Sequence, residues 1–290
     1  GMALANSRDL RLAALNAARA KELYHVKRNE LLPAIHAVGA GSKTHSPAAV
    51  SFSGEEYTNE QYSVDLGVAS WEIDFFGRVR SLKNVALEQY LGTVEARRAA
   101  RLTLVSQVAR TYLALAADRE NLQLARSTLE NLRGYLDLVR RRHEAGLTSE
   151  LDLRRAQAQV DLARDAVSRY QQVAALDRNA LDLLVGAPVP DALLPESWAS
   201  VVTPREISAG LSSDVLLSRP DVMAAEHQLK AANANLGAAR ATFFPRISLT
   251  ALVGTASDAL SGLFGKDSGS WTFAGQAATP IFDTRTVAAA

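Results

Sequence analysis

The chain contains no cysteine, so a metal site would have to be built from its five histidines and its carboxylates. A histidine near a carboxylate can bind zinc or act as a general base, but both roles require a spacing that brings the groups together. The histidines are scattered along the chain, at His25, His36, His45, His143 and His227. The G-x-S-x-G, P-loop and H-E-x-x-H motifs are also missing from the sequence. We therefore predict no enzyme activity, no metal site and no cofactor.

The composition describes a folded protein without a nucleic-acid partner. Hydrophobic residues make up 48% and charged residues 22% of the chain, and the formal net charge is +1. This balance argues against disorder, and a nucleic-acid-binding protein would normally have a basic excess. No apolar run approaches the roughly 18 residues of a transmembrane helix.

A long helical hairpin dominates the pattern, over residues 76–184, with one break at 145–148. Apolar residues recur along both arms at alternating steps of three and four, except at Arg119 and Asp177. This spacing predicts two antiparallel helices wound around each other as a left-handed coiled coil. The first arm would be about 100 Å long at 1.5 Å per residue. Such an arm spans a distance, which an ordinary soluble enzyme does not need.

Strict two-residue alternation predicts β-strands on either side of the hairpin. It is clearest at 61–70, and it returns at 247–253 and 271–278. Residues 34–42 alternate only weakly, and we expect a polar loop from there to about Glu60. Each strand region follows a helical pattern that stops at a proline, which indicates an internal duplication. The alternation itself fits either a sheet on a soluble core or strands of a transmembrane barrel.

These patterns divide the chain into seven segments. We assign an N-terminal helix, a first β-hairpin unit, the long hairpin, a Pro-rich equatorial insert, a helix stacked above the ascending arm, a second β-hairpin unit and the truncated start of another helix. Their bounds are 1–32, 33–75, 76–184, 185–218, 219–244, 245–283 and 284–290.

Several motifs resemble the TolC-like outer-membrane efflux proteins, and most closely the OprM-type channels of multidrug pumps. The resemblance covers nearly the whole chain. It is carried by SRDLRLAALN at 7–16, WEIDFFGRVRS at 71–81, AGLTSELDL at 145–153, RPDV at 219–222, AEHQL at 225–229 and GAARATFFPRISLT at 237–250.

The resemblance implies a mainly α fold with a small β part. The coiled-coil hairpin would form a segment of an α-barrel in the periplasm, and the two β-hairpin units would contribute to a transmembrane β-barrel in the outer membrane. A homotrimer would export drugs and other small solutes passively, together with a periplasmic adaptor and an inner-membrane pump. The family has a second helical hairpin that this sequence lacks. We therefore expect a fragment of a longer protein, with strands that are disordered, swapped or paired with another copy.

The resemblance also assigns candidate sites, each with a plainer alternative. The hairpin tip would dock the adaptor, although the same residues also suit a simple helical turn, and it comprises Ala145, Gly146, Leu147 and Thr148. Polar strand residues would line the lumen, or simply face solvent, and they are Asp65, Arg246, Thr250, Thr272 and Gln276. Apolar strand residues would face lipid, and they are Tyr62, Val64, Leu66, Val68, Ile247, Leu249, Trp271 and Phe273. A soluble coiled-coil scaffold or tethering protein is the alternative function, which would not need the strands.

Overall fold

The computed structural model describes residues 1–51, 54–201, 210 and 212–281. Contacts divide the chain into two compact units, residues 1–15 with 95–221 and residues 16–94 with 222–290. The elements are α1 (Met2–Asn6), α2 (Arg8–Asn29), β1 (His36–Ser46), η1 (Ala48–Val50), β2 (Tyr57–Ile73), α3 (Arg78–Glu144), α4 (Glu150–Val185), η2 (Asp191–Leu193), η3 (Trp198–Ser200), α5 (Asp214–Leu217), α6 (Pro220–Ala241), β3 (Arg246–Ser257), η4 (Leu260–Gly262) and β4 (Gly269–Ala278). No described helix is both long enough and apolar enough to cross a membrane.

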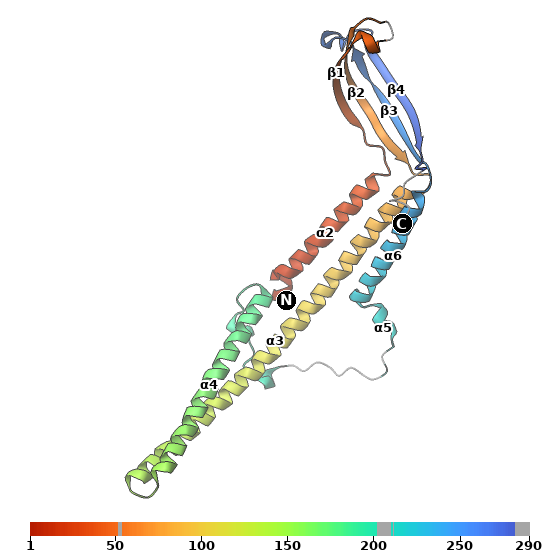
Figure 1. Ribbon diagram of the computed structural model, residues 1–290. Helices are drawn as coiled ribbons and strands as arrows, with labels where there is room; N and C mark the ends of the chain where they lie inside the picture. The colour runs from red at the N-terminus through yellow and green to blue at the C-terminus, as the bar shows by residue number, and fades with distance from the viewer. Residues whose placement is uncertain (52–53, 202–209, 211, 282–290) are drawn as a thin grey trace. The chain divides into compact units, whose positions relative to one another are not determined.

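The first unit is organised by the antiparallel hairpin of α3 and α4 (Figure 1). Helix α3 continues for 67 residues without a break, and α4 for 36. Two buried apolar clusters hold these helices together. The first joins Leu115, Leu181 and Val185 of the helices to Val189 and Leu194 of the segment after α4, and the second lies on the seam itself and comprises Leu129, Val160 and Ala163. The alternating steps of three and four in the sequence therefore produce the predicted packing of one helix against the other.

The Pro-rich segment after α4 is fastened to the hairpin by two arginines. The guanidinium of Arg119 donates a hydrogen bond to the backbone carbonyl of Pro195 at 2.8 Å. Arg178 on α4 forms an ion pair with Asp191 in η2. Arg119 interrupts the apolar pattern of α3 because it reaches the insert.

The N-terminal segment is two helices where the sequence pattern predicted one. Ser7 separates α1 from α2, and it is buried. Its hydroxyl accepts a hydrogen bond from the backbone N–H of Leu10 at 3.4 Å. A serine at this place offers the next helix a side-chain cap, which competes with a continuous helix.

The second unit contains one antiparallel sheet with the strand order β1-β2-β3-β4 (Figure 1). Strands β1 and β2 form one hairpin, β3 and β4 form the other, and β2 pairs with β3. The expectation of disordered strands is therefore wrong for the described residues, while swapping or pairing with another copy stays a prediction. It considered each hairpin alone, whereas the pairing of β2 with β3 joins the two hairpins into one ladder.

The polar loop predicted up to about Glu60 is also wrong, because both ends of that segment are strand. Strand β1 extends to Ser46 and β2 begins at Tyr57. These residues are polar on both sides, so hydropathy alternation does not reveal them. Opposite charges pair across the ladder instead, with Lys43 directly opposite Glu60 and bonded to it.

A β-bulge interrupts the pairing of β2 with β3. Val68 pairs with Ala251 and Trp71 pairs with Leu249, so Ala69 and Ser70 together oppose a single residue. That residue is Thr250, whose hydroxyl donates to the carbonyl of Ala69 at 2.8 Å. The extra residue shifts the alternation by one position. Trp71 and Ile73 consequently lie on the same face as Val68.

The junction between β2 and α3 is held by charged side chains. Both oxygens of Asp74 cap the helix start, accepting from the N–H of Val79 at 3.0 Å and of Arg80 at 2.8 Å. Arg78 pairs with Glu72 at the end of β2. Burial opposes ionisation of Asp74, but the hydrogen bonds from the helix start and from the Arg80 guanidinium outweigh burial and lower its pKa.

Replacing Asp74 by alanine is expected to destabilise the protein by about 0.5–2 kcal/mol at neutral pH, because the first turn of α3 loses its cap. The lowered pKa means that this stabilisation is present above the ordinary value of 3.8 and is lost as the pH falls through the lowered pKa. Urea unfolding at several pH values measures the effect. The difference between wild type and variant should shrink on acidification, and a constant difference would contradict the capping role.

An additional contact within the second unit joins α6 to α3. The imidazole Nδ1 of His227 lies 2.7 Å from the Glu88 carboxylate, and both side chains are largely buried. Gly92 lies beside this histidine, where an added Cβ would be 3.7 Å from the His227 Cβ. Phe76 and Phe244 stack at a centroid distance of 4.7 Å. The sequence patterns identified none of these pairs.

Candidate functional site

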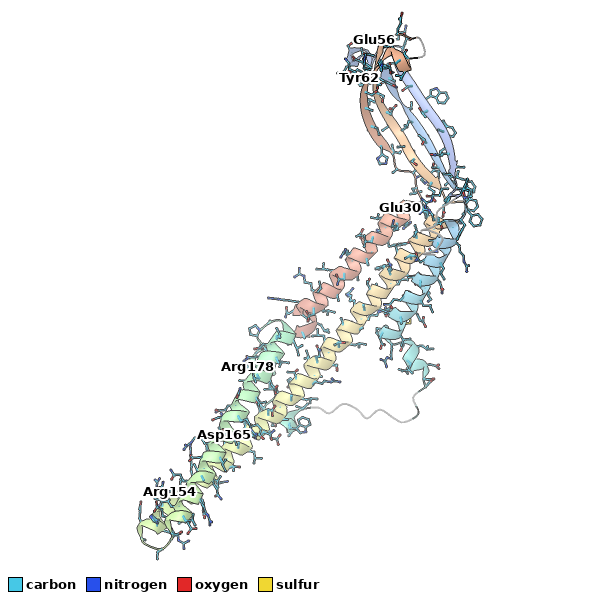
Figure 2. The ribbon with its side chains drawn as sticks, in the orientation of Figure 1. Glu30, Glu56, Tyr62, Arg154, Asp165 and Arg178 are labelled. Atoms are coloured by element: carbon cyan, nitrogen blue, oxygen red, sulfur yellow. The ribbon has the colours of Figure 1, made fainter. Side chains whose placement is uncertain are left out.

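The strand register gathers the predicted apolar residues onto one face of the sheet. Directly paired residues share a face in an antiparallel sheet. Leu66 pairs with Val253, which pairs with Trp271, and Val68 connects through Ala251 to Phe273 in the same way. By the same register the face includes Tyr62, Val64, Ile247 and Leu249. Figure 2 shows Tyr62 on β2 close to the loop that carries Glu56.

This apolar face is exposed in the single chain. Trp271 is 78% exposed, Phe273 68% and Leu66 55%. A contiguous exposed apolar face of this kind marks a surface that meets lipid or protein. Sequence reasoning missed two members of the face, Trp71 and Ile73, because the bulge changes the phase of the alternation.

The predicted polar residues share the opposite face. Asp65 pairs with Gly254 on β3, and Thr250 and Arg246 lie four and eight residues before Gly254 on the same side of that strand. Gln276 pairs with Ser248, which lies between Arg246 and Thr250 on this side. Thr272 joins them through its pairing with Leu252. The register therefore separates the five polar residues from the eight apolar ones.

The tip of the hairpin is capped by backbone hydrogen bonds on its α3 side. Gly146 has φ 74°, in the left-handed region. Its N–H donates to the carbonyl of His143 at 2.9 Å, and the N–H of Leu147 donates to the carbonyl of Arg142 at 2.8 Å. These two bonds form a Schellman motif, which ends helices with a glycine in this position.

The α4 side of the tip is capped as the sequence predicted. The hydroxyl of Ser149 accepts from the N–H of Asp152 at 3.2 Å and donates to its carboxylate at 2.6 Å. Thr148 also donates to that carboxylate, at 3.1 Å. The bonds from Ser149 and Thr148 lower the pKa of Asp152. Leu147 at the turn is 69% exposed, so a fixed backbone presents an apolar side chain.

A groove of about 320 Å³ lies between the helices next to the tip. Tyr135, Leu138 and Arg142 line it from α3, and Asp152 and Arg155 from α4. Tyr135 and Leu138 are both about half exposed. The seam pattern did not identify them, because they lie beside the seam. The sequence did offer a signal for this groove, since Tyr135 and Leu138 lie three residues apart on α3 but outside the seam pattern.

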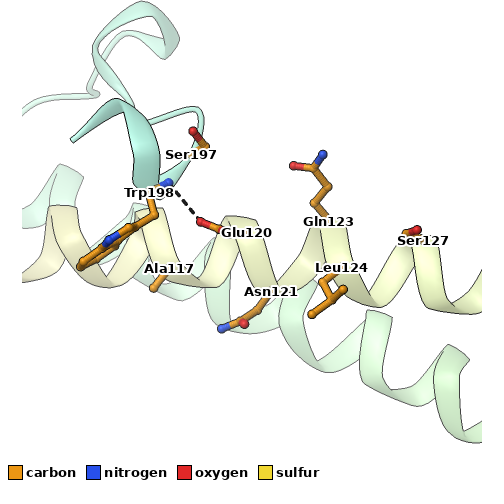
Figure 3. Close-up of a pocket in the computed structure, with 8 residues that line it drawn as sticks. All are labelled: Ala117, Glu120, Asn121, Gln123, Leu124, Ser127, Ser197 and Trp198. Carbon is orange, nitrogen blue, oxygen red and sulfur yellow. Dashed lines mark hydrogen bonds between the residues drawn. The ribbon is translucent and has the colours of Figure 1, made fainter.

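A larger pocket of about 580 Å³ lies where the insert meets α3 (Figure 3). The backbone N–H of Trp198 donates to the carboxylate of Glu120 at 3.3 Å. Asn121, Gln123 and Leu124 line the α3 side. None of its eight lining residues is a histidine, so the pocket offers no imidazole base.

No metal-binding cluster occurs in the part of the chain that the structure describes. Within that part, no three His, Asp or Glu side chains are grouped so that they could hold an ion. The five histidines predicted to be scattered lie apart, on α2, β1, α3 and α6.

Comparisons with known proteins agree with the geometry. The sequence model of the outer membrane efflux protein family matches residues 1–187 and 211–290. The solvent efflux pump outer membrane protein SrpC of Pseudomonas putida is 44% identical over 281 residues, which cover 97% of this chain and 60% of SrpC. The chain thus spans about 60% of the length of this curated relative.

Two solved structures share the fold. A membrane protein of Pseudomonas aeruginosa superposes with a TM-score of 0.93 at 39% identity, covering 99% of this chain and 65% of that one. The open state of the Neisseria gonorrhoeae MtrE outer membrane channel gives 0.86 at 39% identity, with coverages of 99% and 64%. These findings confirm the mainly α, TolC-like fold class and the resemblance drawn from the motifs. The chain belongs to the outer membrane efflux protein family.

Proposed function

We propose that this chain forms part of the wall of an outer-membrane channel, which exports small solutes as the outermost component of an efflux pump. The observation that carries the proposal is the exposed apolar face of the sheet, with Trp271, Phe273 and Leu66 turned outward. Lipid would cover this face, and the opposite face with Asp65 and Arg246 would line the lumen. The helical part would lie in the periplasm. The channel would catalyse no reaction itself, and the partner pump would supply the energy for export.

The open edges of the sheet support a homotrimer. Strands β1 and β4 each pair on one side only within the described chain. An edge strand presents unpaired N–H and C=O groups that can pair with another chain. In a ring of three copies, β1 of each copy would pair with β4 of its neighbour, and twelve strands would close with no free edge.

The capped tip with its exposed Leu147 supports docking of a periplasmic adaptor. Ala145, Gly146, Leu147 and Thr148 would form the contact, with the neighbouring groove beside Tyr135 available to the adaptor's side chains. The adaptor would in turn connect the channel to an inner-membrane pump. The relatives named as parts of solvent and toluene efflux pumps suggest apolar small molecules as substrates.

Deleting the gene in its native cell tests the export role. The deletion strain should accumulate a hydrophobic dye or toluene, and the wild-type gene should restore export. Detergent, and not salt alone, should be needed to extract the protein from membranes. Normal export by the deletion strain together with release by salt would instead support the soluble scaffold.

Replacing Leu147 by aspartate is expected to weaken adaptor binding at least about tenfold, as for a central apolar contact of an interface. Thermal unfolding should not change, because this side chain is 69% exposed. Ser168→Asp, an exposed position on the shaft of α4, adds the same charge away from the tip and should bind normally. Pull-down titration with the adaptor measures both variants, and equal affinities would exclude docking through Leu147.

A further inference from the structure

One polar layer interrupts the apolar seam of the hairpin. Asp177 occupies a seam position of α4, between Ala174 and Leu181. It faces Asp118 of α3 within hydrogen-bonding range. The layer borders the cluster built on Leu115 and Leu181, which are 1% and 2% exposed.

The carboxylate of Asp177 lacks compensation. Its Oδ2 atom is buried and has no hydrogen-bond partner in the described part of the chain. Two cations lie next in sequence to the pair, but both are bound elsewhere. Arg119 donates to the Pro195 carbonyl, and Arg178 is paired with Asp191.

The other acidic groups around the layer add negative charge. Asp182 on α4 accepts from the N–H of Val189 at 2.7 Å, and Glu120 on α3 accepts from the N–H of Trp198. Among the described residues, no Lys, Arg or His nitrogen forms an ion pair with Asp118 or Asp177. Burial raises the pKa of Asp177, and the adjacent Asp118 raises it further.

We propose that Asp118 and Asp177 share one proton across the seam of the folded hairpin, and that losing this proton loosens the packing of α3 against α4. With the proton, one carboxyl donates to the other across the seam. Without it, two carboxylates face each other inside a helix interface, and like charges repel. The layer therefore makes the packing of these helices sensitive to pH, independently of any transport role.

The sign of the effect follows from the raised pKa. A shared proton stabilises the folded hairpin at low pH, and this contribution is lost as the pH rises through the raised pKa. Asparagine at position 177 would donate an amide N–H to Asp118 at every pH, so it mimics the protonated form without titrating.

The experiment compares the whole chain with its Asp177→Asn variant by thermal unfolding over a pH series that starts at the ordinary aspartate pKa of 3.8 and rises to neutral pH. The wild-type Tm should fall between these values by about 2–4 °C more than the variant's Tm. Asp161→Asn is the control, since Asp161 is an exposed carboxylate of α4 paired with Arg164. Its pH profile should follow the wild type. Parallel profiles of wild type and Asp177→Asn would overturn the proposal.

Infrared spectroscopy provides a second measurement that is independent of stability. The folded wild type should show the carbonyl stretch of a protonated carboxyl at pH values above the ordinary aspartate pKa. The band should disappear in both Asp118→Asn and Asp177→Asn. If the wild type has no such band while Asp177 is intact, the pair shares no proton and the proposal fails.

Discussion

Replacing Gly254 by valine is expected to separate β2 from β3 and so divide the sheet into two hairpins. A Cβ at this position would lie 2.2 Å from the carbonyl oxygen of Val64 and 2.7 Å from the Cα of Asp65. Both atoms belong to the backbone of β2, so no side chain can rotate away. The cost should exceed the roughly 1–3 kcal/mol of ordinary overpacking.

Amide hydrogen exchange measures the loss directly. Protection of the β2 and β3 amides should collapse in the Gly254→Val variant, and solute export should be lost with it. Gly275→Val in β4 is the matched control, because nothing lies within 4 Å of its added Cβ. Its ladder should stay protected. If the β2 and β3 amides stayed as protected in Gly254→Val as in Gly275→Val, β3 would have shifted enough to hold the new side chain while keeping its hydrogen bonds to β2.

Replacing Leu115 by alanine is expected to destabilise the helical hairpin by about 2–5 kcal/mol. This side chain is 1% exposed and belongs to the cluster that joins α3, α4 and the insert. Its truncation leaves a cavity where Leu181 and Leu194 would lose contacts. The part of the α3–α4 seam next to the tip should then open more readily. The cluster of Leu129, Val160 and Ala163 would have to hold it without support from the weakened first cluster.

Urea unfolding followed by helical circular dichroism gives the size of this effect. Leu124→Ala provides the comparison on the same helix, where the leucine is 66% exposed and the substitution should change stability by no more than about 0.5 kcal/mol. If both variants unfolded at the same denaturant concentration, the buried cluster would not be the main source of hairpin stability.

The helical part of this fold is readable from the sequence because its information is local. The seam repeats over many turns, Gly146 can adopt the left-handed conformation at little cost, and Ser149 has its partner Asp152 three residues away. Each of these signals lies within a few residues of the structure that it specifies. The same is true of the alternation that separated the apolar from the polar strand residues.

Signals that require a distant partner were missed. Strand β1 is fixed by pairing with β2, whose residues Tyr57 to Glu60 are as polar as its own. The contact of His227 with Glu88 joins residues far apart in the chain. Arg119 and Asp177 were visible only as exceptions to the seam, since their partners lie on the insert and on the other helix. Roles in docking and in lining a lumen depend on other molecules and stay predictions.

The bulge gives β2 one residue more than its partner strand, because Ala69 and Ser70 together oppose Thr250. Removing one of these two residues would leave Trp71 opposite Leu249 and Ile73 opposite Ile247, so every other side chain would keep its face. A deletion elsewhere in β2 would instead slip the pairing by one position and turn a run of side chains to the opposite face. The same loss of a single codon would therefore be tolerated at the bulge, and would act like several simultaneous substitutions a few residues away.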